Sequence, residues 1–527
     1  MENQTHKQAP GVDAVEGGGF SNSVAAVPTA VPVFVGYTEI AQNGKQDLTN
    51  VAVPISSMDE FVSYYGSTAA GMNNGAPAPV FSYASAAFGT PPFQTDPAGP
   101  RFNLFYSLML YFNNGGGICY LMSIGSYADK IANPPVAADY SIAWRALDDC
   151  IEATLVVMPD TMLLSQADWI GVSQQTLQHC AQMQNRIAIF DIWDGYKASD
   201  GGPSDPIRGA SATTGFYPIG ALGEEFNKFG AAYYPWVNTN IVSANDINYS
   251  WFSAGSLALL RADLKAEAPT LFAPDGSGAA AAKTYAALLD SLVLPLPVAP
   301  PADPFGKVAM HALHVSISAL SPLYRQAMAD LATSVNLLPT AGGIAGVYVR
   351  NDDSFGVWQA PANTTIISAI SPSVDISDSG QEDLNMPLNG LAVNAIRSFP
   401  NAGLLIWGAR TMAGNSDDWR YISVRRTAIM LAQSIKAAMA SYVFAPNTAP
   451  TWSDLRFSIS NFLNAQWQVG ALAGGAPSDA YSVAVGLGSS MTDEDILQGF
   501  LVVNVAVAMT HPAEFIMLTF QQQLQTS

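Results

Sequence analysis

Four arginines stand close together in the C-terminal third of this chain of 527 residues. Arg410 follows an apolar run that predicts a buried strand, and Arg420, Arg425 and Arg426 begin a long amphipathic segment. Guanidinium groups bind phosphate or carboxylate through paired hydrogen bonds, so the cluster could hold a phosphate. The chain carries 22 basic and 42 acidic residues, a net charge of −20, which favours a structural cluster that bridges strand ends, carboxylates and neighbouring subunits.

Other residues with catalytic potential lack the neighbours that catalysis needs. His179 and Cys180 are adjacent on a predicted helix, where adjacent side chains point about 100° apart and do not form a nucleophile–base pair. No G-x-S-x-G turn marks a nucleophilic serine. A triad of serine, histidine and aspartate assembled from distant segments stays open, although only five histidines could serve as its base.

The candidate metal and nucleotide sites are equally weak. His311 and His314 have a spacing that can hold a metal, but H-E-x-x-H is absent and no third ligand is evident. The glycines at 115–117 precede a predicted strand, which is the wrong order for a phosphate-binding turn at a helix N-terminus. The sequence therefore predicts no catalytic residue, no cofactor and no metal, and the chain is not expected to be an enzyme.

An acidic run near the C-terminus is a further candidate site. Asp493, Glu494 and Asp495 have the wrong spacing for a calcium-binding loop. Such a run is usually a solvated turn or a helix N-terminal cap, and it can also be a contact surface for a protein partner.

The composition limits the protein's class and its partners. Charged residues make up 12% of the chain, about half of the usual ~25%, so the surface is either rich in small residues or covered by neighbouring subunits. The acidic charge argues against binding to nucleic acid or to an anionic membrane. No apolar run is long enough to span a membrane, and the N-terminus lacks the apolar core of a signal peptide. The three cysteines form no C-x-x-C pair, which indicates reduced thiols.

Periodicity predicts an α/β fold for the first part of the chain. Apolar strands alternate with amphipathic helices, which indicates a parallel sheet covered on both faces. The predicted strands cover residues 31–38, 118–124, 154–158, 186–192 and 231–236, and the predicted helices cover residues 58–66, 102–112, 138–152 and 169–184.

A separate α+β unit is predicted from about residue 384, with helices at 419–443 and 451–471 and strands at 391–398, 403–407, 481–487, 500–508 and 514–521. At the other end of the chain, residues 1–22 are polar and finish in Gly17, Gly18 and Gly19, which give the backbone a swivel. This segment is either a disordered tail or an arm that becomes ordered on a neighbour.

Ten segments resemble contractile tail sheath proteins, the sleeves of phage tails and of phage-tail-like injection systems, and they do so in the same order along the chain. Among them are A-G-V-Y-V-R-N-D-D-S-F-G-V-W-Q-A-P-A-N, L-L-I-W-G-A-R-T, Y-I-S-V-R-R and H-P-A-E-F-I. The ten segments cover residues 26–38, 61–66, 114–120, 231–236, 345–363, 404–411, 421–426, 444–447, 470–474 and 511–516.

The resemblance implies a division of the chain. Residues 23–383 would form an outer, subtilisin-like α/β region with insertions near 68–100 and 247–340, and residues 384–510 an inner α+β domain. The N-terminal arm, 1–22, and the C-terminal strand, 511–527, would pair with sheets of neighbouring subunits. The arm strands would contain Gly11, Val12, Val15, Phe515, Met517 and Leu518, with Gly17, Gly18 and Gly19 as the hinge.

The resemblance also implies a mechanical function. Subunits would assemble in the bacterial cytoplasm as rings or helical strands, with sixfold symmetry expected, around an inner tube protein that Asp493, Glu494 and Asp495 could contact. Contraction would drive the tube through a target envelope. Baseplate proteins, a tail terminator and sheath paralogues would be further partners, in a virion tail or in a particle released from the cell. A static shell protein and an α/β hydrolase-like enzyme remain as alternatives.

Overall fold

The computed structural model describes residues 24–66, 83, 101–272, 278–293, 307–388 and 390–515. These residues belong to two units: a larger one of residues 28–430 and 510–515, and a smaller one of residues 24–27 and 431–509. The expected insertion at 68–100 lies outside the described residues, apart from Tyr83. The same is true of the N-terminal arm at 1–22.

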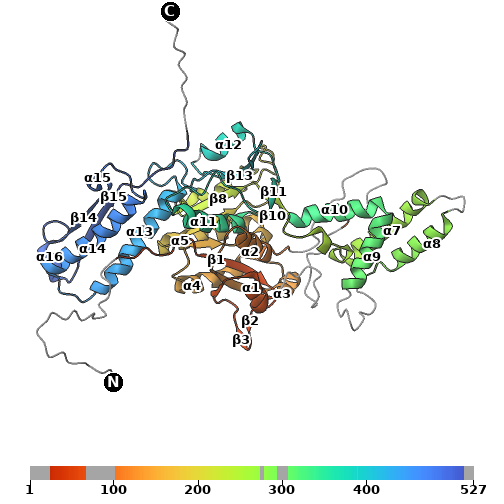
Figure 1. Ribbon diagram of the computed structural model, residues 1–527, viewed down its shortest axis with the longest axis horizontal. Coiled ribbons are helices and arrows are strands. Elements are labelled where there is room, and N and C mark those ends of the chain that lie inside the picture. The colour runs from red at the N-terminus through yellow and green to blue at the C-terminus, as the bar shows by residue number, and fades with distance from the viewer. Residues whose placement is uncertain are drawn as a thin grey trace, which may run out of the picture. The chain divides into compact units, whose positions relative to one another are not determined.

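An eight-stranded sheet forms the centre of the larger unit (Figure 1). Its six inner strands are parallel, and the two edge strands, β13 and β4, run antiparallel to their neighbours. The predicted α/β fold with a parallel sheet is thus confirmed. In spatial order the strands are β13 (Gly403–Trp407), β12 (Asn394–Phe399), β8 (Gly230–Tyr234), β7 (Ile187–Asp191), β6 (Leu155–Val157), β1 (Pro32–Thr38), β5 (Cys119–Ser126) and β4 (Val53–Ile55).

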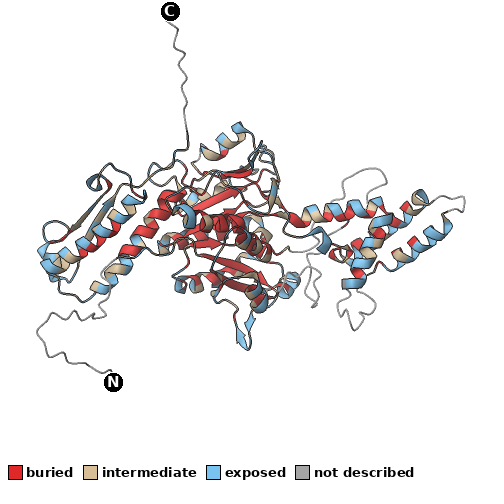
Figure 2. Ribbon diagram, viewed as in Figure 1, coloured by how far each residue is buried: buried red, intermediate tan, exposed pale blue. Residues whose placement is uncertain are grey.

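Helices cover both faces of this sheet. The chain runs from β1 through α2 (Leu104–Asn113) to β5. It then returns past β1, through α4 (Ser141–Asp149) to β6 and through α5 (Gln166–Met183) to β7. Because parallel crossovers are right-handed, connections that run in opposite directions along a sheet lie on opposite faces. Strands β1, β6, β7 and β8 are consequently buried along their whole length, within the red centre of Figure 2.

The larger unit contains these further elements besides a group of helices described below. Its helices are α1 (Met58–Tyr65), α2 (Leu104–Asn113), α3 (Tyr127–Ala132), α4 (Ser141–Asp149), α5 (Gln166–Met183), α6 (Glu224–Asn227), α11 (Ala341–Phe355) and α12 (Asp378–Asn385). Its short 3₁₀ helices are η1 (Ala137–Tyr140), η2 (Pro159–Leu163), η3 (Tyr217–Leu222), η4 (Ala244–Asp246) and η5 (Tyr249–Trp251). Its minor sheets contain β10 (Leu337–Leu338), β9 (Val237–Thr239) and β11 (Ala369–Pro372), and β2 (Gln42–Asn43) and β3 (Gln46–Asp47).

Two glycines, one in the motif at residues 345–363 and one just before it, stand where a side chain would not fit. A Cβ atom on Gly342 would collide with the backbone of Ser107, and one on Gly346 with the backbone of Tyr111. Both glycines lie on α11, and their partners lie on α2. The missing side chains therefore let the two helices pack backbone against backbone on one face of the sheet.

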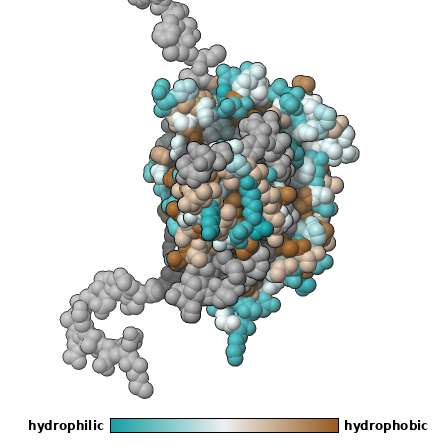
Figure 3. Space-filling view, turned by 90° about the vertical axis from the view of Figure 1, so that its right-hand side faces the viewer, coloured by the Kyte–Doolittle hydropathy of each residue, from teal (hydrophilic) through white to brown (hydrophobic). Residues whose placement is uncertain are grey.

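The segment expected as an insertion at 247–340 contains a group of helices with its own apolar core. The helices are α7 (Ala254–Leu271), α8 (Ala279–Asp290), α9 (Lys307–Leu320) and α10 (Pro322–Asn336). Buried Glu267 accepts hydrogen bonds from the Ser321 hydroxyl at 2.5 Å and the Leu323 backbone N–H at 3.1 Å, so it caps the start of α10. In Figure 3, apolar and hydrophilic residues are interspersed on this end of the molecule.

The smaller unit consists of helices packed on a two-stranded antiparallel sheet. The strands are β14 (Tyr481–Val485) and β15 (Val503–Val507), and α14 (Ala449–Gln468) packs against β14. Its helices are α14 (Ala449–Gln468), α15 (Pro477–Ala480) and α16 (Asp493–Leu497), with η6 (Ala440–Tyr442).

The chain divides within α13 (Ile422–Met439), whereas the sequence placed the boundary near residue 384. The difference arises from β12 and β13, which were expected in the C-terminal unit. Asn394 of β12 pairs in parallel with Tyr233 of β8, so both strands extend the large sheet.

Candidate functional site

Arg410 binds the last described part of the chain. Its guanidinium is 2% exposed and donates two hydrogen bonds to the carboxylate of Glu514, from Nε at 2.9 Å and from Nη2 at 2.6 Å. The carbonyl of Gly414 accepts a third bond at 2.9 Å. Asn385 and the hydroxyl of Tyr421 also donate to Glu514, at 2.8 and 3.0 Å. This network holds the backbone one residue before Phe515.

Arg426 makes a similar arrangement near the first described residues. It donates to both carboxylate oxygens of Asp352, at 2.9 and 2.6 Å, and to the backbone carbonyl of Thr29 at 3.0 Å. The hydroxyl of Thr29 donates to the same carboxylate at 2.5 Å. The guanidinium also lies 4.6 Å from the ring centre of Tyr348, a cation–π contact. Thr29 is thus tied by one hydrogen bond to Asp352 of α11 and by one to Arg426 of α13, and these two side chains are themselves paired.

The other two arginines have different surroundings. Arg425 lies between two aromatic rings, 4.0 Å from the centre of Phe229 and 4.8 Å from that of Trp419. Burial lowers the pKa of Arg425 to about 10, so it stays charged at neutral pH. Arg420 is more exposed and pairs with Asp417, three residues earlier on the chain.

The four guanidinium groups therefore do not converge on one anion-binding position. Three bind carboxylates of this chain and one stacks between rings, which favours the structural interpretation of the cluster over phosphate binding. The sequence reasoning missed the carboxylate partners. Asp352 and Glu514 both lie inside segments that resemble the sheath family, at 345–363 and 511–516, and this was the available signal.

The acidic run forms the start of α16 in the smaller unit. Thr492 caps this helix. Its hydroxyl accepts a hydrogen bond from the backbone N–H of Asp495, and the carboxylate of Asp495 accepts one from the backbone N–H of Thr492. These hydrogen bonds lower the pKa of Asp495. Asp493 and Glu494 are exposed at the same helix end. The apolar side chains of Leu497 and Phe500 follow them and are exposed as well.

The predicted arm residues are mostly outside the described part of the chain. Gly11, Val12, Val15, Met517, Leu518 and the hinge glycines Gly17, Gly18 and Gly19 all lie there. Phe515 is described and is 69% exposed.

His179 packs inside the larger unit. Its Nδ1 lies 3.3 Å from the carboxylate of Asp148 and its Nε2 lies 3.4 Å from the guanidinium of Arg186. Burial, together with the nearby positive charge of Arg186, lowers the pKa of His179 to about 4, so the ring is neutral at pH 7. Cys180 is buried, and its burial raises the pKa of the thiol to about 12. The raised pKa of the Cys180 thiol is the opposite of the lowered pKa that a reactive cysteine has.

The second histidine pair and the remaining cysteines have packing surroundings too. His311 and His314 lie on α9 with ring centres 6.4 Å apart, and Nδ1 of His314 lies 3.1 Å from the hydroxyl of Tyr324. Within the described residues, no group of three or more His, Cys, Asp or Glu side chains could hold a metal ion. Cys119 and Cys150 are free and buried, and burial raises the pKa of both thiols.

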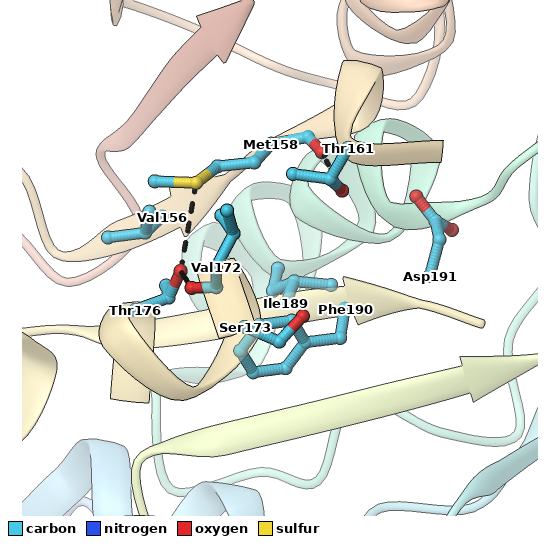
Figure 4. A pocket seen from close by; sticks show the side chains of 9 residues that line it. All are labelled: Val156, Met158, Thr161, Val172, Ser173, Thr176, Ile189, Phe190 and Asp191. Carbon is cyan, nitrogen blue, oxygen red and sulfur yellow. Dashed lines mark hydrogen bonds between the residues drawn. The ribbon is translucent and has the colours of Figure 1, made fainter. Parts of the chain in front are cut away.

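A small cavity lies between β6, β7 and α5 (Figure 4). Its volume of about 10 Å³ has room for roughly one water molecule. The hydroxyl of Thr176 donates to the carbonyl of Val172 at 2.8 Å, and the carboxylate of Asp191 binds backbone N–H groups of Thr340 and Ala341. The lining residues are Val156, Met158, Thr161, Val172, Ser173, Thr176, Ile189, Phe190 and Asp191. No histidine lines it.

A larger cavity of about 160 Å³ lies between the loop after β7 and α12. Arg208 and Asp383, which line it, form an ion pair at 2.6 Å. Its volume is below the roughly 300 Å³ at which small-molecule sites begin. Among the described residues, no helix is long and apolar enough to cross a membrane.

The chain is similar to proteins of one structural class. Residues 415–523 match the family described as "Phage tail sheath C-terminal domain". Among solved structures, the helical sheath of the anti-feeding prophage (AFP) in the contracted state matches with 26% identity and a TM-score of 0.58. This match covers 98% of this chain and 100% of that one.

Two further structures match over nearly their full length. The extracellular contractile injection system PVC sheath complex in the contracted state has 25% identity and a TM-score of 0.56, with 99% of each chain covered. A chain of the sixfold-symmetrised AFP baseplate has 26% identity and a TM-score of 0.57, with 98% of this chain and 100% of that chain covered. None of the curated proteins matches the sequence significantly.

Proposed function

Because this chain is a homologue of contractile sheath proteins, we propose that it polymerises around an inner tube and contracts to drive that tube through a target envelope. The observation that carries the proposal is the correspondence with sheath structures over 98% or more of the chain, at TM-scores of 0.56 and 0.58. A likeness of this extent includes both units and not only a shared parallel sheet.

The arms are proposed to link subunits through the sheet of the smaller unit. Within the described residues this sheet has only β14 and β15, and an isolated two-stranded sheet is marginally stable in water. Each strand also presents an outer edge with backbone groups that can pair with an added strand. We propose that residues 11–16 of one neighbour and 515–521 of another supply such strands, with Gly17, Gly18 and Gly19 as the hinge.

Contraction is proposed to move rigid units while the arms keep subunits connected. Energy stored at assembly would drive it, so the function needs no nucleotide or other cofactor, and the chain's role is structural and not enzymatic. The proposed partners are further copies in sixfold rings, the tube protein, baseplate and terminator proteins, and sheath paralogues. The matches to the PVC and AFP sheaths and to the AFP baseplate support self-assembly and association with a baseplate.

The low charge of the chain agrees with a surface that neighbouring subunits cover. We propose that the protein assembles in the bacterial cytoplasm and is released as part of a phage or phage-tail-like particle. The three free, buried cysteines are compatible with a reducing compartment.

Negative-stain electron microscopy at increasing protein concentration, with and without the tube protein, tests the proposal. We expect hollow ribbed cylinders that occur in a long and a short form. A variant without residues 1–19 is expected to stay folded, by circular dichroism, but to form no cylinders. A variant without residues 1–9 keeps the proposed strand and serves as the matched control.

Cylinders of one fixed length would instead indicate a static shell. Normal cylinders from the variant without residues 1–19 would contradict the assignment of the arm.

A further inference from the structure

The two most buried ion-paired arginines of the described chain each bind a residue close to one of its two ends. Arg410 and Arg426 are 2% and 3% exposed, whereas the other ion-paired arginines, Arg208, Arg397 and Arg420, are 13% to 47% exposed. Both belong to the same strand–loop–helix motif.

At each end of the described chain, the contacts bind a residue close to that end. Glu514 lies one residue before the end of the described chain. Its carboxylate is bound by Arg410, which lies in the loop after β13. Thr29 is six residues into the described chain, counting from residue 24. It is held through its carbonyl by Arg426 and through its hydroxyl by Asp352.

Buried ion pairs of this kind are a poor means of stabilising a fold, because desolvation offsets most of their attraction. They are effective at fixing geometry, since paired guanidinium–carboxylate bonds are directional and hard to release one at a time. A force on a terminal segment must break several charge-assisted hydrogen bonds together before it can detach that segment from the larger unit.

We propose that the Arg410–Glu514 and Arg426–Asp352–Thr29 contacts are mechanical anchors, which pass tension from the two terminal segments into the larger unit. This inference rests on the proposed function, in which the terminal segments link neighbouring subunits. The anchors keep tension from detaching Thr29 and Glu514 from the larger unit when the subunits move.

Single-molecule pulling on the full chain, through peptide tags fused at both ends, tests this proposal without any need for assembly. The Glu514→Gln variant keeps the shape of the side chain but removes the charge that binds Arg410. The Thr29→Val variant removes one hydroxyl bond and leaves the Arg426–Asp352 pair in place, so the unit still folds. Asp383→Asn is the matched control, since it breaks an ion pair with the same 2.6 Å separation whose partners are exposed.

For Glu514→Gln we expect the first extension event under constant force to occur about tenfold faster or more, as the loss of a charge-assisted bond predicts. Thr29→Val should accelerate detachment by about threefold to tenfold. Asp383→Asn should match the wild type. Equal rates for all four proteins would overturn the proposal.

A second measurement uses the assembled protein. Cylinders of the Glu514→Gln variant should break into shorter fragments than wild-type cylinders under the same shear, while those of Asp383→Asn should not. Equal fragment lengths for the three proteins would also contradict the proposal. If wild-type protein forms no cylinders, the proposed function fails, and the pulling rates still decide whether the anchors exist.

Discussion

The carboxylate of Asp191 accepts a hydrogen bond from the backbone N–H of Thr340 at 2.6 Å, across 149 residues of sequence. It accepts a second from Ala341 at 2.8 Å, so the carboxyl end of β7 caps the start of α11. Asp160, which follows β6, does the same for α2 through the N–H groups of Asn103 and Leu104. The ends of two neighbouring strands thereby position the two helices that pack together on one face of the sheet.

Removal of one such cap should weaken the larger unit. We expect Asp191→Ala to lower the free energy of unfolding by about 2 kcal/mol, because two buried N–H groups lose their acceptor. Asp191→Asn should cost less, since Oδ1 accepts both bonds and an amide retains that oxygen. Urea unfolding followed by tryptophan fluorescence measures both values. An equal loss for the two variants would mean that the charge, and not the acceptor, holds α11.

The close approach of α2 and α11 gives a second prediction. Gly346→Ala should destabilise the larger unit by about 1–3 kcal/mol, because the new Cβ would collide with the backbone carbonyl of Tyr111. Gly171→Ala on α5 is the matched control, since its Cβ would meet nothing within 4 Å. That change should be neutral or stabilising by up to about 1 kcal/mol. A comparison of the two denaturation midpoints decides the matter, and similar midpoints would argue against tight packing of α2 on α11.

The anchor at Glu514 should depend on pH with a definite sign. Burial acts to raise the pKa of Glu514, but hydrogen bonds from Arg410 and Asn385 outweigh it and hold the pKa below its ordinary value of 4.5. A lowered folded pKa means that the carboxylate adds stability above pH 4.5, and that this stability is lost as the pH falls through the folded value.

The difference in unfolding free energy between wild type and Glu514→Gln should therefore be constant from about pH 6 to about pH 8 and shrink toward zero in acid. Urea titrations at a series of pH values measure it. A difference that grows in acid would contradict the assignment of a charged Glu514.

The acidic start of α16 gives a prediction about the proposed tube contact. Replacement of Asp493 and Glu494 by lysine should weaken co-sedimentation with the tube protein, because the two exposed carboxylates would change sign. Asp495 should be kept, since its carboxylate caps the helix and its loss would disturb the fold. Asp479→Lys, at an exposed position of α15, is the control. Unchanged co-sedimentation of the double variant would remove α16 from the contact surface.

The alternation of strands and helices could be predicted from the sequence because it depends on local patterns. Two examples are the mainly apolar run of β1 and helix α1, which Ser57 caps and Gly66 ends with φ at +82°. The order of strands could not be predicted in the same way. Nothing in the local pattern of 394–407 says whether it pairs with β8 or with the C-terminal strands, since that choice depends on contacts across more than 150 residues.

The candidate site, too, could be predicted only in part from the sequence. The cluster of arginines is visible in the sequence, and its structural interpretation follows from the charge balance. The partners of those arginines are 104 and 74 residues away, for Glu514 and Asp352, and only folding brings them together.

The burial of Cys119, Cys150 and Cys180 has a practical consequence. Their thiols are shielded and their pKa values are raised, so thiol reagents at neutral pH should leave the native protein unmodified. A single cysteine introduced on an exposed helix would then be the one reactive position in each copy. Pairs of dyes attached there could report distances between neighbouring copies in real time, in the natural sequence background and without removal of any native cysteine.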